Sequence, residues 1–176
     1  TGCTSPNPVV GAVIVKGGRI LARGAHEQAG SPHAEVMALR NLSALSPSEH
    51  ASGATLYVTL EPCCTHGRTP PCTEAILKAG FARVVIGALD PNPLHAGRAV
   101  QILEAGGVKV IVGVLEADCT AVNRAFFKRI TTGRPWVIAK AGMSLDGRMT
   151  RPPGEGQWLT GPAARRDAHR LRVRVD

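Results

Sequence analysis

The stretch ATLYVTLEPCCTHGRTPPCTEAILKAGFARVVIGAL, residues 54–89, decides the fold. Residues 54–60 and 82–89 are runs of β-branched and aliphatic side chains and predict buried strands. Between them, residues 71–80 predict a helix closed by Gly80 at the left-handed capping position. Strands separated by a helix of this length are typical of parallel pairing within one sheet.

The same alternation continues on both sides of this stretch. Residues 9–24 predict a tight hairpin, because two β-branched runs are split by Gly17-Gly18, which supply the positive φ of such a turn. Residues 31–42 predict an amphipathic helix that starts near His33, after a Ser and a Pro. We therefore expect a three-layer α/β/α sandwich with a mixed, largely parallel sheet. The remaining elements are expected as a helix at 97–107, a strand at 108–115 and a helix at 116–133.

Length and hydrophobicity limit the classes of protein that fit. A chain of 176 residues holds one full domain and part of a second. Hydrophobic residues make up 44% of it, yet no apolar run approaches the roughly 18 residues of a membrane span. The chain starts at Thr1 and shows no basic stretch followed by an apolar segment, so we expect a trimmed start, no signal peptide and a cytoplasmic location.

The net charge of +8 has two explanations, a nucleic-acid surface or a site for a phosphorylated small molecule together with a basic tail. Six arginines lie within residues 151–176, so much of the excess charge is a terminal feature. Aromatic residues make up only 3% of the chain, which leaves few stacking platforms for single-stranded nucleic acid. The sequence favours the small molecule over nucleic acid as partner.

Two cysteines, Cys63 and Cys72, each follow a proline in EPCCTHGRTPPC, residues 61–72. A disulfide between them is one reading, but a reducing compartment favours metal binding or catalysis. His33, in the segment PHAE, completes a set of three zinc ligands with the fourth tetrahedral position open, which is typical of a catalytic zinc. Cys64 is a neighbour that could replace Cys63, although no proline precedes it.

Glu35 is the predicted proton carrier of this site. Zinc with two thiolates and a neutral imidazole is formally neutral. The bound water is then the group that loses a proton most readily, with a pKa lowered to about 7. Residues two apart on a helix point roughly 200° from each other, so His33 and Glu35 both reach the metal only if His33 lies in the first turn. Cys72 opens its own helix, where free N–H groups favour a thiolate.

A His-x-Glu motif with Pro-Cys and a later Cys resembles the zinc-dependent nucleoside and nucleobase deaminases. Most of those space the thiols as Pro-Cys-x-x-Cys, whereas eight residues separate the thiols here. That spacing resembles the deaminase domain of the bifunctional riboflavin-biosynthesis proteins, the RibD family. Four segments carry the resemblance: TSPNPVVGAVIV (4–15), HEQAGSPHAEVMAL (26–39), EPCCTHGRTPPC (61–72) and ALDPNPLHAG (88–97).

This resemblance implies hydrolytic deamination of 2,5-diamino-6-ribosylamino-4(3H)-pyrimidinone 5′-phosphate. It also implies that Asn7, His26 and Arg68 line the substrate pocket, and a guanidinium such as that of Arg68 suits a ribose phosphate. Relatives usually place a His where Thr65 stands, and His66 follows it here. Either Thr65 or His66 is expected to face the substrate.

Residues 134–176 resemble the start of the reductase domain that follows the deaminase domain, residues 1–133, in this family. The resemblance implies a dihydrofolate-reductase-like fold that uses NADPH, with Gly142 and Trp158 at the cofactor and Arg172 at the substrate. About 43 residues are too few for that domain, so we expect a fragment without reductase activity. Its apolar residues are expected on an exposed strand, namely Trp136, Val137, Ile138 and Leu145.

Two other functions stay open at this point. A nucleoside or tRNA deaminase would share the zinc chemistry but is expected to show Pro-Cys-x-x-Cys. A non-enzymatic zinc-binding module would need a fourth protein ligand, for which His66 is the candidate. The sequence leaves open whether the chain forms a homo-oligomer.

Overall fold

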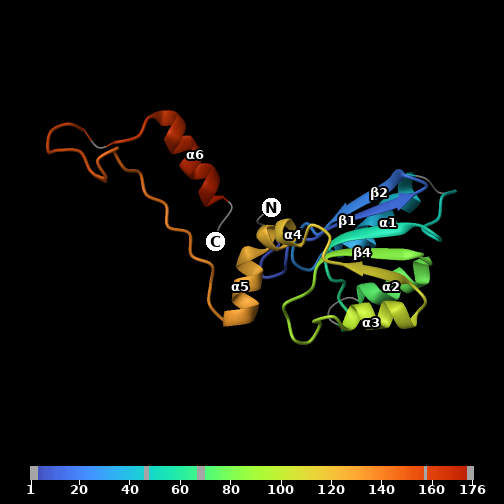
Figure 1. The fold of residues 1–176 in the computed structure, drawn as a ribbon. Coiled ribbons are helices and arrows are strands. Elements are labelled where there is room, and N and C mark those ends of the chain that lie inside the picture. Colours follow the sequence, from blue (N-terminus) through green and yellow to red (C-terminus); the bar gives the residue numbers. More distant parts are fainter. Residues whose placement is uncertain (1–3, 46–47, 67–69, 157, 174–176) are drawn as a thin grey trace. The chain divides into compact units, whose positions relative to one another are not determined.

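The computed structural model describes residues 4–45, 48–66, 70–156 and 158–173. Within these ranges the chain forms a five-stranded sheet in the order β2-β1-β3-β4-β5 (Figure 1). β1 is antiparallel to β2 and β3, whereas β3, β4 and β5 are mutually parallel. Only β1 therefore runs against the other strands, as expected for a largely parallel sheet. The strands are β1 (Gly11–Lys16), β2 (Arg19–Ala25), β3 (Thr55–Leu60), β4 (Arg83–Ala88) and β5 (Lys109–Val112).

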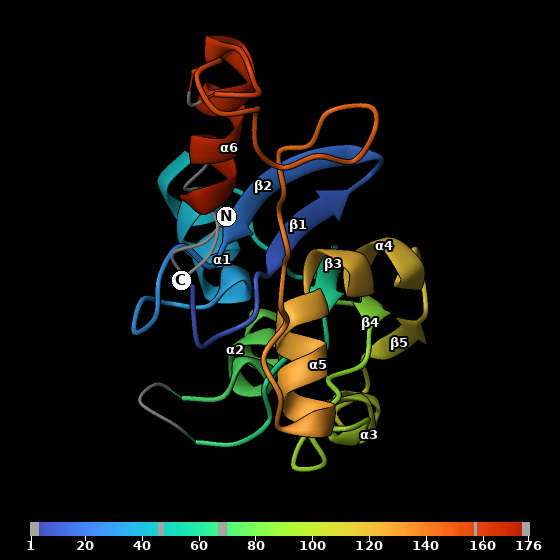
Figure 2. The same ribbon diagram turned by 90° about the vertical axis from the view of Figure 1, so that its left-hand side faces the viewer.

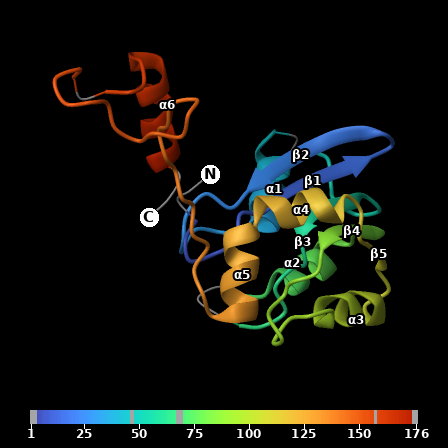
Figure 3. The same ribbon diagram turned by 60° about the vertical axis from the view of Figure 1, so that its left-hand side comes forward.

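Helices lie on both faces of the sheet. On one face α1 packs on β1 and β2, α3 packs on β5, and α2 lies between α1 and α3. On the other face α4 packs on β4, in front of the strands in Figures 2 and 3. This arrangement confirms the predicted three-layer sandwich. The helices are α1 (Ala34–Leu45), α2 (Cys72–Ala79), α3 (Arg98–Ala105), α4 (Glu116–Val122) and α5 (Arg124–Thr132).

The main core lies between the sheet and the layer formed by α1, α2 and α3. Alternate residues of each strand point into it, so Val84 and Ile86 of β4 are fully buried. Burying a side chain of this size contributes about 1.5–3 kcal/mol. Gly87 points to the opposite face, where a Cβ would collide with Cys119 of α4. The fully buried members of the core include Ile14, Leu56, Ile76, Val84, Ile86 and Leu103.

A close approach between β2 and α1 fixes where α1 begins. A Cβ at Gly24 would collide with the backbone of Ala34 and Ala38, so only glycine allows the helix to lie this near the strand. His33 directly precedes α1, and its carbonyl accepts the N–H of Met37 at 2.9 Å, as an N-cap residue does. The packing of the N-terminal hairpin thus places His33 and Glu35.

The single helix predicted at 116–133 is wrong, because the structure has two helices that meet at Asn123. Asn123 leaves the helical conformation, with φ −109° and ψ 21°. Its side chain instead binds the backbone of Val9. A tertiary contact has therefore interrupted a pattern that is locally helical.

The chain divides into two compact units, the first ending at Trp136 and the second beginning at Val137. The second contains α6 (Pro162–Arg172). Trp136, Val137, Ile138 and Leu145 are exposed, as expected. The predicted strand is wrong, because residues 134–144 form neither helix nor strand; a strand needs a neighbour to satisfy its hydrogen bonds. None of the helices in the described ranges has the length and apolar character that crossing a bilayer requires.

Candidate active site

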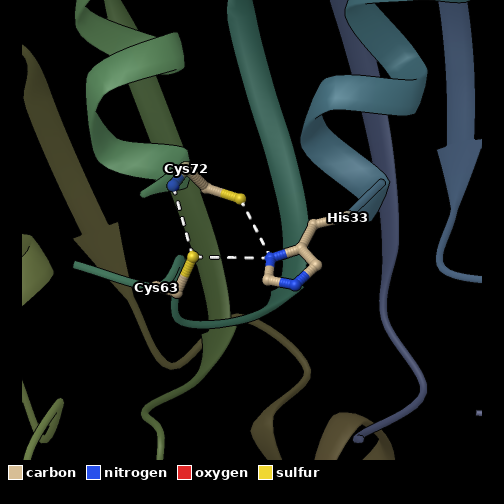
Figure 4. A group of neighbouring side chains, drawn as sticks. All are labelled: His33, Cys63 and Cys72. Atoms are coloured by element: carbon tan, nitrogen blue, oxygen red, sulfur yellow. Dashed lines mark hydrogen bonds between the residues drawn. The ribbon is translucent and has the colours of Figure 1, made fainter. Parts of the chain in front are cut away.

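Three side chains converge where β3 ends and where α1 and α2 begin. His33 precedes α1, Cys63 follows β3, and Cys72 is the first residue of α2. Their ligand atoms all lie within 4.8 Å of one another (Figure 4). The two cysteines are free thiols rather than a disulfide. The structure thus brings together the three residues that the sequence singles out as zinc ligands.

The distances within this cluster suit a tetrahedral zinc site. Nδ1 of His33 lies 3.3 Å from Sγ of Cys72 and 3.4 Å from Sγ of Cys63. Zinc–sulfur bonds of about 2.3 Å and zinc–nitrogen bonds of about 2.0–2.1 Å would place these atoms about 3.6 Å apart. The Nδ1 atom and the sulfurs need to separate by only a few tenths of an ångström to accommodate the ion, with Nδ1 as the ligating nitrogen.

The two thiols share a hydrogen bond that shifts their pKa values in opposite directions. The pKa of Cys63 is lowered to about 4, chiefly because Cys72 donates a hydrogen bond to its sulfur. The backbone N–H of Cys72, free at the start of α2, also lies 3.2 Å from that sulfur. The pKa of Cys72 is raised, first by this interaction with Cys63 and then by burial. Two sulfurs and an imidazole nitrogen at this spacing are donors that zinc prefers, so the donor set fits zinc.

Among the described residues, this cluster contains three potential ligands and no fourth His, Cys, Asp or Glu. His66, the candidate fourth ligand of a closed structural site, is exposed and lies 3.1 Å from Glu74 on α2. An open fourth position is typical of catalytic rather than structural zinc. The cluster therefore favours an enzyme over a zinc-binding module.

Glu35 lies in the first turn of α1 and is only 3% exposed. Burial is the main cause that raises the pKa of its carboxyl group. The nearby Cys63, His33 and Cys72 also act on that pKa, which shows that Glu35 adjoins the cluster. A buried carboxyl group that binds a proton more readily than usual suits an acid–base role near neutral pH.

Asn7 and His26 form a hydrogen-bonded pair beside the cluster. The Nδ1 atom of His26 lies 3.2 Å from the carbonyl oxygen of Pro32. Because a carbonyl only accepts, Nδ1 carries the proton, and Nε2 accepts from the Asn7 amide at 3.1 Å. The rings of His26 and His33 meet edge to face with centroids 5.3 Å apart. The structure thus places both predicted substrate residues next to the predicted metal ligands.

The other predicted site residues are less directly placed. Thr65 and His66 are both exposed, and the His66 ring lies against Glu74. Arg68 lies outside the described residues. Gly142, Trp158 and Arg172 belong to the second unit, where the Arg165 guanidinium lies 4.9 Å from the centroid of the Trp158 ring.

Glu61 is a functional candidate that the sequence analysis missed. It is 4% exposed, and its carboxylate accepts the backbone N–H groups of Asp90, Gly97 and Ala99 at 2.9–3.1 Å. These bonds cap α3 and hold the segment 90–97 against the cysteine loop, where His95 lies 3.5 Å from Cys64. The sequence signal that could have identified Glu61 is an acidic residue directly after a buried strand.

Glu61→Gln is expected to lower the free energy of unfolding by about 3 kcal/mol, because an amide NH₂ cannot accept the N–H groups that the carboxylate accepts. Chemical denaturation measures this loss. The control Glu49→Gln removes an exposed ion pair with Arg19 and should cost about 1 kcal/mol or less. Equal losses in the two variants would contradict the capping role.

Two regions of the chain match known families. Residues 1–88 match the cytidine and deoxycytidylate deaminase zinc-binding region, and this match contains His33, Glu35, Cys63 and Cys72. Residues 135–176 match the RibD C-terminal domain. In the sequence, the segment between the two matched regions contains α3, β5, α4 and α5.

Individual relatives extend over almost the whole chain. The chain is 51% identical to the riboflavin biosynthesis protein RibD of Escherichia coli over 170 residues, which cover 97% of this chain and 45% of that protein. Among solved structures it resembles Acinetobacter baumannii RibD, with 48% identity, a TM-score of 0.85 and coverage of 97% of this chain and 47% of the other.

A second solved structure is a diaminohydroxyphosphoribosylaminopyrimidine deaminase/5-amino-6-(5-phosphoribosylamino)uracil reductase from Thermotoga maritima. It shares 44% identity and a TM-score of 0.87, over 97% of this chain and 48% of that one. The chain therefore spans about half the length of the relatives it matches.

Proposed function

The chain belongs to the zinc-binding cytidine and deoxycytidylate deaminase family and carries a RibD-like deaminase domain, and on this premise we propose that it deaminates a phosphorylated diaminopyrimidine. The substrate would be 2,5-diamino-6-ribosylamino-4(3H)-pyrimidinone 5′-phosphate, which water converts to the corresponding pyrimidinedione with release of ammonia. The observation that carries the proposal is the group of His33, Cys63 and Cys72 beside the buried Glu35. The likeness to the Thermotoga maritima diaminohydroxyphosphoribosylaminopyrimidine deaminase supports this substrate.

Each residue of the group has a defined chemical task. His33, Cys63 and Cys72 would hold the zinc ion, which when bound lowers the pKa of a water molecule toward about 7. The Glu35 carboxylate accepts a proton of the attacking water and passes it to the substrate, so that the amino group leaves as ammonia. Burial keeps bulk water from competing for that proton.

Asn7 and His26 would hold the pyrimidine ring. The His26 imidazole, protonated on Nδ1, orients the Asn7 amide through Nε2. The Oδ1 atom and the second N–H of the Asn7 amide can form hydrogen bonds with the polar edge of a pyrimidine. A missing hydrogen bond at such a position discriminates strongly between substrates. On the family resemblance we assign Arg68 to the ribose phosphate, and either Thr65 or His66 to a contact with the substrate.

For residues 134–176, which include the second unit, we propose the start of a reductase domain. Their match to the RibD C-terminal domain supports this assignment. In a longer chain Gly142 and Trp158 would contact NADPH and Arg172 the substrate. The 176 residues by themselves are expected not to oxidise NADPH. A reducing compartment such as the cytoplasm suits the protein, because both zinc-binding thiols must stay reduced.

The test compares substrates with the purified, zinc-loaded chain. Ammonia release is measured with the pyrimidine phosphate, with cytidine, with deoxycytidylate and with tRNA, and NADPH oxidation is followed in parallel. We expect release from the pyrimidine phosphate and loss of that activity on chelation of zinc. Preferential release from cytidine, deoxycytidylate or tRNA would instead assign a nucleoside, nucleotide or tRNA deaminase, and release from none would leave a zinc-binding module.

A further inference from the structure

A buried amide connects the helices α4 and α5 to the N-terminal loop. Asn123 lies where α4 ends and α5 begins, and it is 3% exposed. Its Oδ1 accepts the N–H of Val9 at 2.8 Å, and its Nδ2 donates to the carbonyl oxygen of Val9 at 2.8 Å. The two residues are 114 positions apart in the sequence. One side chain therefore satisfies both polar groups of a distant residue.

Asn123 makes this contact in place of a local one. Asparagine directly before a helix usually caps it by accepting a backbone N–H of the first turn. Asn123 stands directly before α5, but its side chain forms no such cap. The amide is used instead for a tertiary contact, whose two hydrogen bonds imitate the pairing of neighbouring strands.

Val9 belongs to the segment that supports the candidate substrate residues. Asn7 is two residues before it, and the carbonyl oxygen of the next residue, Val10, accepts the N–H of His26 at 3.0 Å. The side chains of Asn7 and His26 then bind each other. Asn123, the N-terminal loop and His26 thus form one connected hydrogen-bond network, which ends beside His33.

We propose that Asn123 is a positioning residue for substrate binding, which holds Asn7 and His26 in place through the backbone of Val9. The proposal rests on the proposed function, since it takes Asn7 and His26 as substrate contacts. Glu35 and Cys72 lie in α1 and α2, His33 directly before α1, and Cys63 directly after β3. Within the part of the chain that the structure describes, the hydrogen bonds of the Asn123 side chain go to Val9 and not to these residues. Removing the amide should therefore disturb substrate affinity and leave the metal site intact.

The test compares Asn123→Ala and Asn123→Asp with a matched control. Aspartate keeps the acceptor for the Val9 N–H but sets an oxygen against the Val9 carbonyl. The control is Asn41→Ala, since the Asn41 amide also binds a distant backbone carbonyl, that of Arg23 at 2.8 Å. With the pyrimidine phosphate, we expect both Asn123 variants to raise KM about tenfold, the effect of about 1.4 kcal/mol, with kcat and zinc content nearly unchanged. Asn41→Ala should leave KM unchanged.

Hydrogen–deuterium exchange supplies a readout that does not need activity. The amides of residues 9–12 should exchange faster in both Asn123 variants and not in the control. Unchanged exchange would overturn the inference, as would faster exchange with an unchanged KM, or failure of both variants to fold. If the wild-type chain does not act on the pyrimidine phosphate, the proposed function fails separately. The exchange data then decide whether Asn123 holds the loop.

Discussion

Glu35→Gln is expected to lower the turnover of the deamination by about 10²- to 10⁴-fold while the protein keeps its zinc. Glutamine has nearly the shape of glutamate and fills the same buried place at the start of α1, so the fold should persist. It cannot take a proton from water and return it to the substrate. Steady-state kinetics and metal analysis of the same preparation measure the two halves of this prediction.

The matched control is Glu104→Gln, an exposed position on α3 outside the cluster. It should retain wild-type turnover. Loss of zinc from a folded Glu35→Gln protein would show that Glu35 helps to hold the metal, and near-normal turnover would show that another group carries the proton. Either result would contradict the role assigned to Glu35.

Cys63→Ala and Cys72→Ala are each expected to abolish stoichiometric zinc binding, and the activity with it. Each substitution removes one of three protein ligands that lie within 4.8 Å of one another. A site left with two ligands competes poorly for zinc, because the affinity depends on the number of thiolates and imidazoles. The wild-type chain should carry about one zinc ion, measured by elemental analysis after dialysis.

Cys64→Ala is the control for this prediction, because Cys64 neighbours Cys63 in sequence but lies against His95. Its sulfur is not part of the group of His33, Cys63 and Cys72 ligand atoms that lie within 4.8 Å of one another. The variant should keep its zinc and most of its activity. Zinc loss from Cys64→Ala equal to that from Cys63→Ala would mean that the ligand assignment is wrong.

The strands and helices of the deaminase unit could be predicted because their signals are local. Gly17-Gly18 marks the hairpin between β1 and β2, and both glycines have the positive φ that the prediction required. The alternation of apolar runs and helical segments then limits the sheet to a mixed, mainly parallel one. The set of His33, Cys63, Cys72 and Glu35 followed from residue types whose zinc chemistry leaves few alternatives.

Other features depend on contacts between distant parts of the chain, and no local pattern reports them. The helical pattern of residues 116–133 continues through Asn123, yet the chain breaks there because the amide satisfies Val9. In the same way His66 pairs with Glu74 instead of facing the cluster.

The sequence by itself determined most elements of the first unit, the likeness to zinc deaminases and the residues able to hold the metal. Only the tertiary structure decided that Nδ1 of His33 faces both sulfurs, that Glu61 caps α3 and that Asn123 supports the N-terminal loop. The physical reason is that apolar burial repeats with the period of a helix or strand. A buried polar group instead needs one specific partner, and that partner can lie anywhere along the chain.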